Sequence, residues 1–106
     1  MNMENRKIDG NYVAKADEHF KGMITGNVTV KSGVKFINHG MICEDVIVEE
    51  NGCFYNHGMV NGNVTGEGYA EVWGVVKGYL SSMLNTYVHQ EAIVNGKRYE
   101  FDEKFI

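Results

Sequence analysis

Proline is absent from the 106 residues of this chain, and only two cysteines and one tryptophan occur in it. Disordered chains are usually rich in proline and poor in apolar residues, whereas 43% of these residues are hydrophobic, so we expect the chain to fold over nearly its whole length. Cys43 and Cys53 match no metal-binding or redox spacing, which favours free thiols in a reducing compartment. No stretch approaches the roughly 18 apolar residues of a membrane span, and the start from Met1 to Lys7 is polar.

Positive charge is also scarce. Ten basic residues stand against fourteen acidic ones, which gives a formal net charge of -4. The chain therefore lacks the basic excess that neutralising the phosphates of a nucleic acid requires, and its acidity suits a basic protein partner. Its length is near the commonest domain size, so we expect one domain over residues 1–106. These features predict a cytoplasmic protein without a membrane span that binds protein rather than nucleic acid.

A tandem repeat of 18 residues dominates the sequence. The first copy reads MITGNVTVKSGVKFINHG over residues 23–40, and the second reads MICEDVIVEENGCFYNHG over residues 41–58. A third copy over residues 59–74 matches once two residues are deleted before its tryptophan, and a degenerate fourth follows over residues 75–91. Self-similarity at a fixed period is the signature of a solenoid, in which each copy forms one coil.

Apolar residues recur every six positions within each copy. The unbroken apolar series is Ile24, Val30, Phe36, Ile42, Val48, Phe54 and Val60. A second series, four positions further on, holds glycine and valine only. Alternating steps of two and four fit a short strand followed by a turn, whereas a helix needs steps of three and four. The sequence therefore predicts an all-β, single-domain parallel β-helix with triangular coils of about 18 residues.

Aligning the copies predicts which residues stack along the solenoid axis. Three apolar columns are expected: Ile24, Ile42, Val60, Val76 and Ile93; Val28, Val46, Val64 and Leu80; and Phe36, Phe54, Val72 and Tyr87. The two ends would expose unpaired strand edges and must be covered. We therefore expect residues 1–22 to form an N-terminal cap, residues 23–96 the coils and residues 97–106 a C-terminal cap.

The tandem pattern Gly-x-Val-x-Val, as in Gly26-Asn27-Val28-Thr29-Val30 and Gly62-Asn63-Val64, resembles the bactofilin-like bacterial β-helix proteins over residues 23–96. The resemblance implies a right-handed helix that assembles end to end into cytoskeletal filaments. The chain differs from that family in lacking long proline-rich flanks and in having about four coils. The period of six is also similar to that of left-handed hexapeptide acyltransferases, which generally carry more coils and a protruding loop.

Two Asn-His-Gly motifs, at residues 38–40 and 56–58, occupy the same position in successive copies. Histidines one rung apart, about 4.8 Å, could hold a metal or share a proton. A structural corner is favoured, because asparagine and glycine tolerate a left-handed backbone, stacked amides hydrogen-bond along the axis, and a metal wants more ligands. Adjacent carboxylates such as Glu44 and Asp45 point to opposite faces of a strand and are interpreted as solvated charge. We expect no catalytic residue, cofactor or metal.

Outward positions predict a contact face. Ile37, Tyr55 and Trp73 are expected to stack in one ladder, and Met23, Met41, Met59 and Val75 in another on the far side of the histidine corner. Exposed aromatic and apolar patches mark contact surfaces, although cross-strand ladders also stabilise a solenoid and the termini could cover them. The apolar residues Phe101, Phe105 and Ile106 would either fold over the last coil or contact another molecule.

The sequence favours a non-catalytic module for protein–protein interaction or self-assembly. The predicted partner-binding residues are Ile37, Met41, Tyr55, Met59, Trp73, Phe101 and Phe105. The alternative is a small acidic immunity protein that neutralises a bacterial toxin by binding it, which the size and charge would suit. An acyltransferase is a more distant third.

Overall fold

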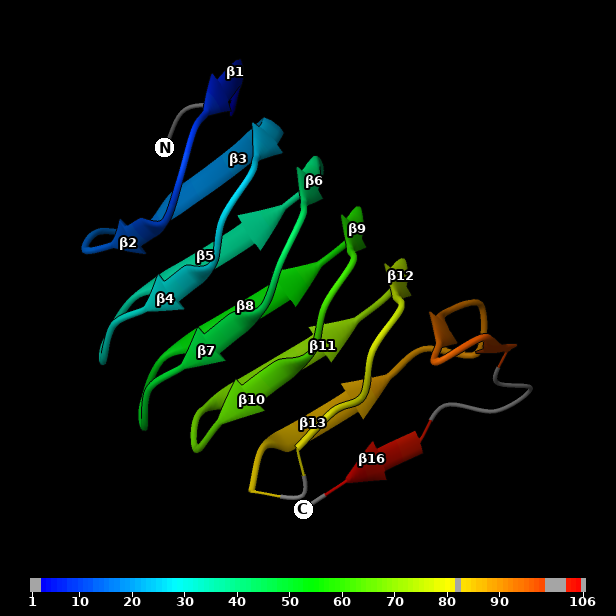
Figure 1. Cartoon of the computed structure of the whole chain (residues 1–106). Helices are drawn as coiled ribbons and strands as arrows, with labels where there is room; N and C mark the ends of the chain where they lie inside the picture. Colours follow the sequence, from blue (N-terminus) through cyan, green and yellow to red (C-terminus); the bar gives the residue numbers. More distant parts are fainter. Residues whose placement is uncertain (1–2, 82, 99–102, 106) are drawn as a thin grey trace.

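A computed structural model gives the fold and describes residues 3–81, 83–98 and 103–105. The described chain is all β, with parallel strands about 18 residues apart that wind into a solenoid of about five turns. Figure 1 shows the coils stacked side by side in the order of the sequence. The molecule measures 33 × 24 × 22 Å. The predicted fold class, an all-β parallel β-helix in a single compact domain, is confirmed.

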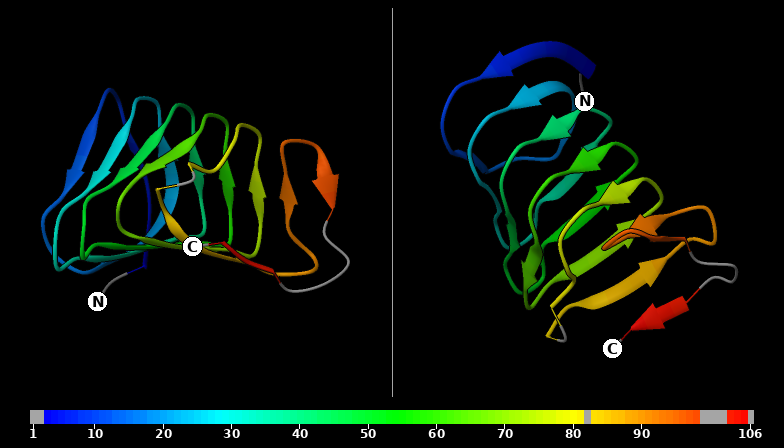
Figure 2. Two further views of the ribbon diagram at one scale, coloured as in Figure 1. Left: turned by 90° about the horizontal axis from the view of Figure 1, so that it is seen from below. Right: turned by 45° about the vertical axis from the view of Figure 1, so that its right-hand side comes forward.

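Strands from successive coils form three rows, which Figures 1 and 2 show from different sides. The tyrosine face consists of β5 (Lys35–Asn38), β8 (Cys53–Asn56), β11 (Tyr69–Val72) and β13 (Asn85–Val88). The methionine face consists of β6 (Met41–Ile42), β9 (Met59–Val60), β12 (Val75–Val76) and β14 (Ile93–Val94). The threonine face consists of β2 (Tyr12–Ala14), β4 (Val28–Val30), β7 (Val46–Val48) and β10 (Val64–Gly66). The longer β3 (Glu18–Ile24) pairs with both β5 and β6, so it joins the tyrosine and methionine faces.

The six-residue apolar series lines the interior, as predicted. Each of its members is fully buried. Three phenylalanine rings stack within this core, with centroids 6.1 Å apart between Phe20 and Phe36 and 6.1 Å apart between Phe36 and Phe54. Burying a side chain of this size stabilises a fold by about 1.5–3 kcal/mol. The column of rings is therefore a main source of the stability of the first three coils.

Pairing between coils confirms one of the three predicted columns in full and corrects the later members of the other two. Residues that pair as expected are Ile24, Ile42, Val60 and Val76 in one column, and Val28, Val46, Val64 and Leu80 in another. The first column continues with the buried Val94, because Ile93 pairs with Val75. The column that begins with Phe36 and Phe54 continues with Ala70 and Thr86, so the prediction of Val72 and Tyr87 there was wrong.

The place where the third coil loses two residues explains this correction. The turn between β7 and β8 spans residues 49–52, and the equivalent turn between β10 and β11 holds only Glu67 and Gly68. Gly66 enters the shortened turn with a φ of 113°, and a Cβ atom there would lie 2.0 Å from the carbonyl oxygen of Val48. Tyr69 therefore pairs with Cys53, sixteen residues earlier, and every later residue of β11 shifts with it.

A ladder of asparagine and aspartate side chains, which the sequence analysis did not anticipate, holds the corner between the methionine and threonine faces. In each coil a side-chain oxygen accepts a hydrogen bond from a backbone N–H of the next coil. The donor–acceptor pairs are Asn27 N with Asn11 Oδ1, Asp45 N with Asn27 Oδ1, Asn63 N with Asp45 Oδ1 and Tyr79 N with Asn63 Oδ1, at 2.8 to 3.0 Å. Asp45, predicted to be solvated charge, instead stabilises this corner.

The N-terminal segment, expected to form a cap, pairs as a coil of its own. β1 (Met3–Ile8) runs parallel to β3, and β2 runs parallel to β4. Two inward positions of this first coil hold polar side chains where the following coils are apolar, since Tyr12 pairs with Val28 and Glu18 with Phe36, whereas Ala14 pairs with Val30 and is fully buried. The first coil therefore continues the backbone of the solenoid and part of its apolar core.

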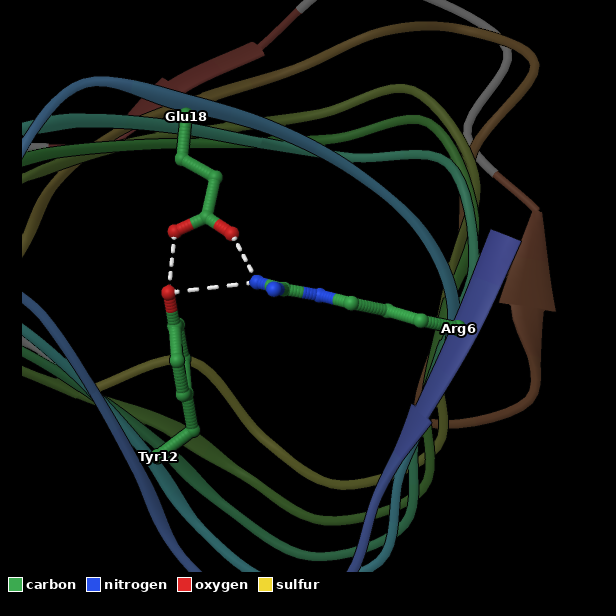
Figure 3. Close-up of polar contacts among 3 residues, drawn as sticks. All are labelled: Arg6, Tyr12 and Glu18. Atoms are coloured by element: carbon green, nitrogen blue, oxygen red, sulfur yellow. Dashed lines mark hydrogen bonds and ion pairs between the residues drawn. The ribbon is translucent and has the colours of Figure 1, made fainter. Parts of the chain in front are cut away.

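Figure 3 shows the side chains of Arg6, Tyr12 and Glu18 meeting inside the first coil. The Glu18 carboxylate accepts one hydrogen bond from Arg6 Nη2 and another from the Tyr12 hydroxyl. The guanidinium carbon of Arg6 lies 5.7 Å from the ring centroid of Phe20. These three residues, the polar plug, cover the N-terminal end of the phenylalanine stack with hydrogen-bonded charge.

The C-terminal segment closes the other end with antiparallel strands. β15 (Lys97–Arg98) folds back on β14 through Asn95 and Gly96, whose φ angles of 51° and 78° are those of a type I′ hairpin turn. β16 (Glu103–Phe105) lies antiparallel to β13. Of the apolar residues expected in this segment, Phe101 and Ile106 lie outside the described residues, and Phe105 is placed only as a backbone position opposite Thr86.

Val46→Asp tests the coil assignment. The Val46 side chain is fully buried between Val28 and Val64, so a carboxylate there is unpaired and should cost about 3–5 kcal/mol or more, a large part of the roughly 5–15 kcal/mol by which single domains are stable. The matched control is Ile47→Asp at the next residue, which is 37% exposed and should stay folded. Urea unfolding followed by circular dichroism measures both, and equal stability of the two variants would contradict the assignment.

Replacing both charges of the polar plug, as Arg6→Met with Glu18→Leu, tests its role at the end of the core. Exchanging a charged pair for apolar residues is often neutral or stabilising, so the free energy of unfolding should change by less than about 2 kcal/mol. Association should increase, because the open end of the core becomes apolar. Arg6→Met alone should instead destabilise by about 1–3 kcal/mol by leaving Glu18 without its cation. Sedimentation velocity that shows no larger species for the double variant would contradict this role.

Candidate functional site

Five aromatic rings stack along the corner between the tyrosine and methionine faces. They include all four histidines and the single tryptophan of the chain, in the order His19, His39, His57, Trp73 and His89. Successive ring centroids lie 4.5, 5.0, 5.7 and 4.1 Å apart. His39 and His57 stack as the sequence predicted, and the stack, which we call the ring stack, extends well beyond them.

Buried asparagines hold this corner in place. Asn38 and Asn56 are fully buried, and Asn38 Nδ2 donates a hydrogen bond of 2.9 Å to Asn56 Oδ1 one coil further along. Asn56 Nδ2 in turn donates to the Val75 carbonyl oxygen at 3.0 Å. The predicted ladder of amides along the axis is thus confirmed. It fixes the backbone from which the histidine rings project.

The glycines that follow the rings are required for a different reason from the one predicted. Gly40 and Gly58 do not have a positive φ, so they do not supply a left-handed backbone. Instead, a Cβ atom on Gly40 would lie 2.2 Å from the carbonyl oxygen of Gly22, and one on Gly58 would lie 2.1 Å from that of Gly40. Gly74, after the tryptophan, meets Gly58 in the same way at 2.2 Å. The backbones of successive coils approach too closely at this corner for any side chain.

Trp73 lies in the ring stack, not in the ladder predicted for it. The outward ladder of the tyrosine face runs through Ile37, Tyr55, Glu71 and Tyr87. Because the third coil is two residues short, Glu71 stands where Trp73 was expected, and Trp73 stacks on the ring of His57. The glycine after each ring could have revealed the position of Trp73 from the sequence. His57-Gly58 aligns with Trp73-Gly74 once the two-residue gap of the third copy is placed at the Gly66–Gly68 turn.

The methionine ladder is confirmed on the other side of the ring stack. Met23, Met41, Met59 and Val75 pair in succession, and Ile93 extends the ladder by one rung. All of these side chains are half-buried. The ring stack is thus flanked on one face by apolar side chains and on the other by tyrosines, and we call the whole area the corner surface.

Glu71 is the polar centre of the tyrosine face. The Tyr69 hydroxyl donates to Glu71 Oε2 at 2.8 Å, and Trp73 Nε1 donates to Glu71 Oε1 at 2.9 Å. Burial and the hydrogen bond to Glu71 raise the pKa of Tyr69 well above its usual value, and burial together with Cys53 raises that of Tyr55. These tyrosines remain neutral hydrogen-bond donors at physiological pH. Neither Tyr69 nor Glu71 was predicted as a site residue, and Tyr87 was expected in an inward column.

The part of the chain that the structure describes contains no cluster of metal-ligating side chains at this surface. Within residues 3–81, 83–98 and 103–105 there is no group of three or more His, Cys, Asp or Glu side chains placed to hold a metal ion. Cys43 and Cys53 are free, half-buried thiols. The same part of the chain contains no helix that could cross a membrane. What the corner surface presents is stacked rings, apolar side chains and one oriented carboxylate.

Titration of the ring stack should make stability depend on pH. Burial, then His19 and His57, then Lys21 lower the pKa of His39, and burial lowers that of His57 although Glu71 opposes the effect. Since the unfolded chain binds these protons more tightly, the free energy of unfolding should fall as the pH drops through the unfolded value of about 6.5. It should level off below the folded pKa values.

Urea unfolding between pH 8 and pH 5 measures this dependence. The double variant His39→Asn with His57→Asn should remain folded at pH 7.5 and should show a shallower fall in stability. An equal or steeper fall in the double variant would contradict the assignment of the dependence to these two rings.

Comparison with known proteins adds no relative to this picture. No protein-family profile matches the chain, and no curated protein or solved structure is significantly similar to it. The bactofilin-like resemblance is therefore supported only at the level of fold, a parallel β-solenoid with coils about 18 residues apart. The case for a function rests on the geometry of the corner surface.

Proposed function

We propose that this chain is a non-catalytic interaction module that contacts a protein partner through the corner surface. The observation that supports this most directly is the continuous ring stack between two half-buried ladders of apolar and tyrosine side chains. Rigid aromatic side chains are enriched at protein interfaces because they offer large contact areas at a low cost in entropy. Methionine is enriched there because its flexible thioether side chain adapts to the partner's surface. Trp73, which is 37% exposed and lies between His57 and His89 in the stack, is the natural anchor.

The sides of the solenoid suit this role better than its ends. End-to-end assembly of the bactofilin-like kind would need an apolar core and open parallel strands at both ends. Here the polar plug lies over the core at the N-terminal end, and the antiparallel strands β15 and β16 reverse the chain direction at the other. Both features are of the kind that natural β proteins use to limit edge-to-edge pairing. We therefore place self-association, if the partner is a second copy, on the corner surface.

The double variant Tyr55→Ala with Trp73→Ala tests the proposal. Both residues point outward, so the fold should survive, whereas association through the corner surface should weaken at least about tenfold. The matched control is Ile47→Ala with Thr65→Ala on the threonine face, because Ile47 is 37% exposed, as Trp73 is. Circular dichroism checks the fold, and sedimentation equilibrium measures the self-association constant.

The same variants distinguish the two kinds of partner. If the wild type remains a monomer up to about 1 mM, the partner is not a second copy, and the variants are then tested in a pull-down against the product of any toxin-like neighbouring gene. Such a partner, captured by the control but not by the Tyr55/Trp73 variant, would identify an immunity protein acting in the cytoplasm. Unchanged association of the Tyr55/Trp73 variant with either partner would show that the contact lies elsewhere.

A further inference from the structure

Glu71 is surrounded by aromatic side chains on the tyrosine face. Tyr69 lies two residues before Glu71 on β11, so it points to the same face of the strand, and Trp73, just beyond the end of β11, reaches Glu71 through its indole N–H. Tyr55 and Tyr87 pair with Glu71 from the neighbouring coils. The Tyr55 and Tyr69 rings meet edge to face at 6.2 Å, and the Trp73 and Tyr87 rings lie 6.0 Å apart. A single carboxylate thus stands at the centre of four aromatic residues.

The carboxylate is oriented but has capacity left to accept hydrogen bonds. Each of its oxygens accepts one hydrogen bond, from Tyr69 and from Trp73. An ionised carboxylate can accept about four hydrogen bonds, so about one acceptor site remains on each oxygen. A guanidinium group pairs with a carboxylate by donating one hydrogen bond to each of its two oxygens.

No ion pair of Glu71 is found among the side chains that the structure describes, which are those of residues 6–81 and 83–96. Ion pairs found there link Arg6 with Glu18, Lys7 with Asp9 and Lys31 with Glu49. The two hydrogen-bond donors to Glu71 are neutral groups, a phenol and an indole. A half-buried carboxylate among rings attracts a cation more strongly than one in open water, because the local dielectric is lower.

We propose that Glu71 and its four aromatic neighbours form a binding site for an arginine side chain of the protein partner. Arginine fits better than lysine because its planar guanidinium pairs with both carboxylate oxygens, stacks on aromatic rings and is more weakly hydrated. The net charge of -4 on this chain would also favour approach of a basic partner. The inference rests on the proposed function, since it names what the corner surface recognises.

A purely structural role for Glu71 makes different predictions. In that case the carboxylate only orients Tyr69 and Trp73, and a cation gains nothing from it. Glu71→Gln separates the two roles, since glutamine retains an oxygen that accepts from one of the two donors but has no charge. Glu44→Gln is the matched control, because it removes one exposed charge away from the site.

The single tryptophan makes the site directly observable. N-acetyl-arginine methylamide is titrated into the full chain while the Trp73 indole N–H resonance and the tryptophan fluorescence are followed. Saturable binding is expected with a dissociation constant on the order of 1–10 mM, as one anchoring side chain supplies only part of an interface. The lysine analogue should bind at least about threefold more weakly. The uncharged citrulline analogue, which keeps the shape of arginine, should not bind.

The variants complete the test. Glu71→Gln should weaken arginine binding at least about tenfold, and Glu44→Gln should leave it unchanged within about twofold. Absence of a saturable change in Trp73, equal binding of citrulline, or unchanged binding by Glu71→Gln would each overturn the proposal. The titration of the wild type needs no folded variant, so its outcome stands by itself.

Failure of this inference is distinguishable from failure of the proposed function. If arginine does not bind but Tyr55→Ala with Trp73→Ala still abolishes association, the corner surface is a contact face that does not recognise arginine. If arginine binds while the double variant associates normally, the site exists but lies outside the interface.

Discussion

Parallel pairing between successive coils is the constraint on which the rest of this structure depends. It places each side chain directly over the equivalent side chain of the neighbouring coil, about 4.8 Å away. Stacking of like on like is therefore favoured. Phenylalanine stacks on phenylalanine in the core, asparagine bonds to asparagine at one corner, and three asparagines and one aspartate line up at another.

The same constraint makes the ends of the solenoid special, because the first and last coils have a neighbour on one side only. The two ends meet this problem in different ways. At the N-terminal end the backbone pairing continues while Arg6, Tyr12 and Glu18 turn inward and hydrogen-bond to one another (Figure 3). At the C-terminal end the chain reverses direction, and antiparallel strands pair with the last coil on two of the three faces. Both arrangements leave the sides of the molecule as the larger uniform surfaces.

A regular repeat gives regular ladders, so a distinctive site needs a break in the repeat. The shortened turn at Gly66–Gly68 provides this break. It moves Trp73 into line with the histidines and places Glu71 in a ladder otherwise made of Ile37, Tyr55 and Tyr87. The one carboxylate among these aromatic residues is thus a consequence of a deletion five residues away from the tryptophan it contacts, not of any motif around it.

The sequence by itself determined the architecture and most of the core. The period of 18 and its division into sixes required stacked coils, because only a strand and turn repeat buries residues at steps of two and four. The same pattern identified the stacked His39 and His57, the asparagine amides and the methionine ladder. Each of these depends only on spacing within intact repeats, where sequence register and spatial register coincide.

Tertiary structure alone decided what happens where the repeat is imperfect. A gap of two residues can be placed at several points of a sequence alignment with equally good matches. In the fold it must fall where the backbone can turn more tightly, which here is Gly66, a glycine with a positive φ. That choice set the partners of Trp73, Glu71 and Tyr87. The polar plug could not be predicted from the repeat either, because Arg6, Tyr12 and Glu18 come together only when the first coil closes. Periodicity predicts which residues stack, whereas contacts across a coil depend on the closed path of the backbone.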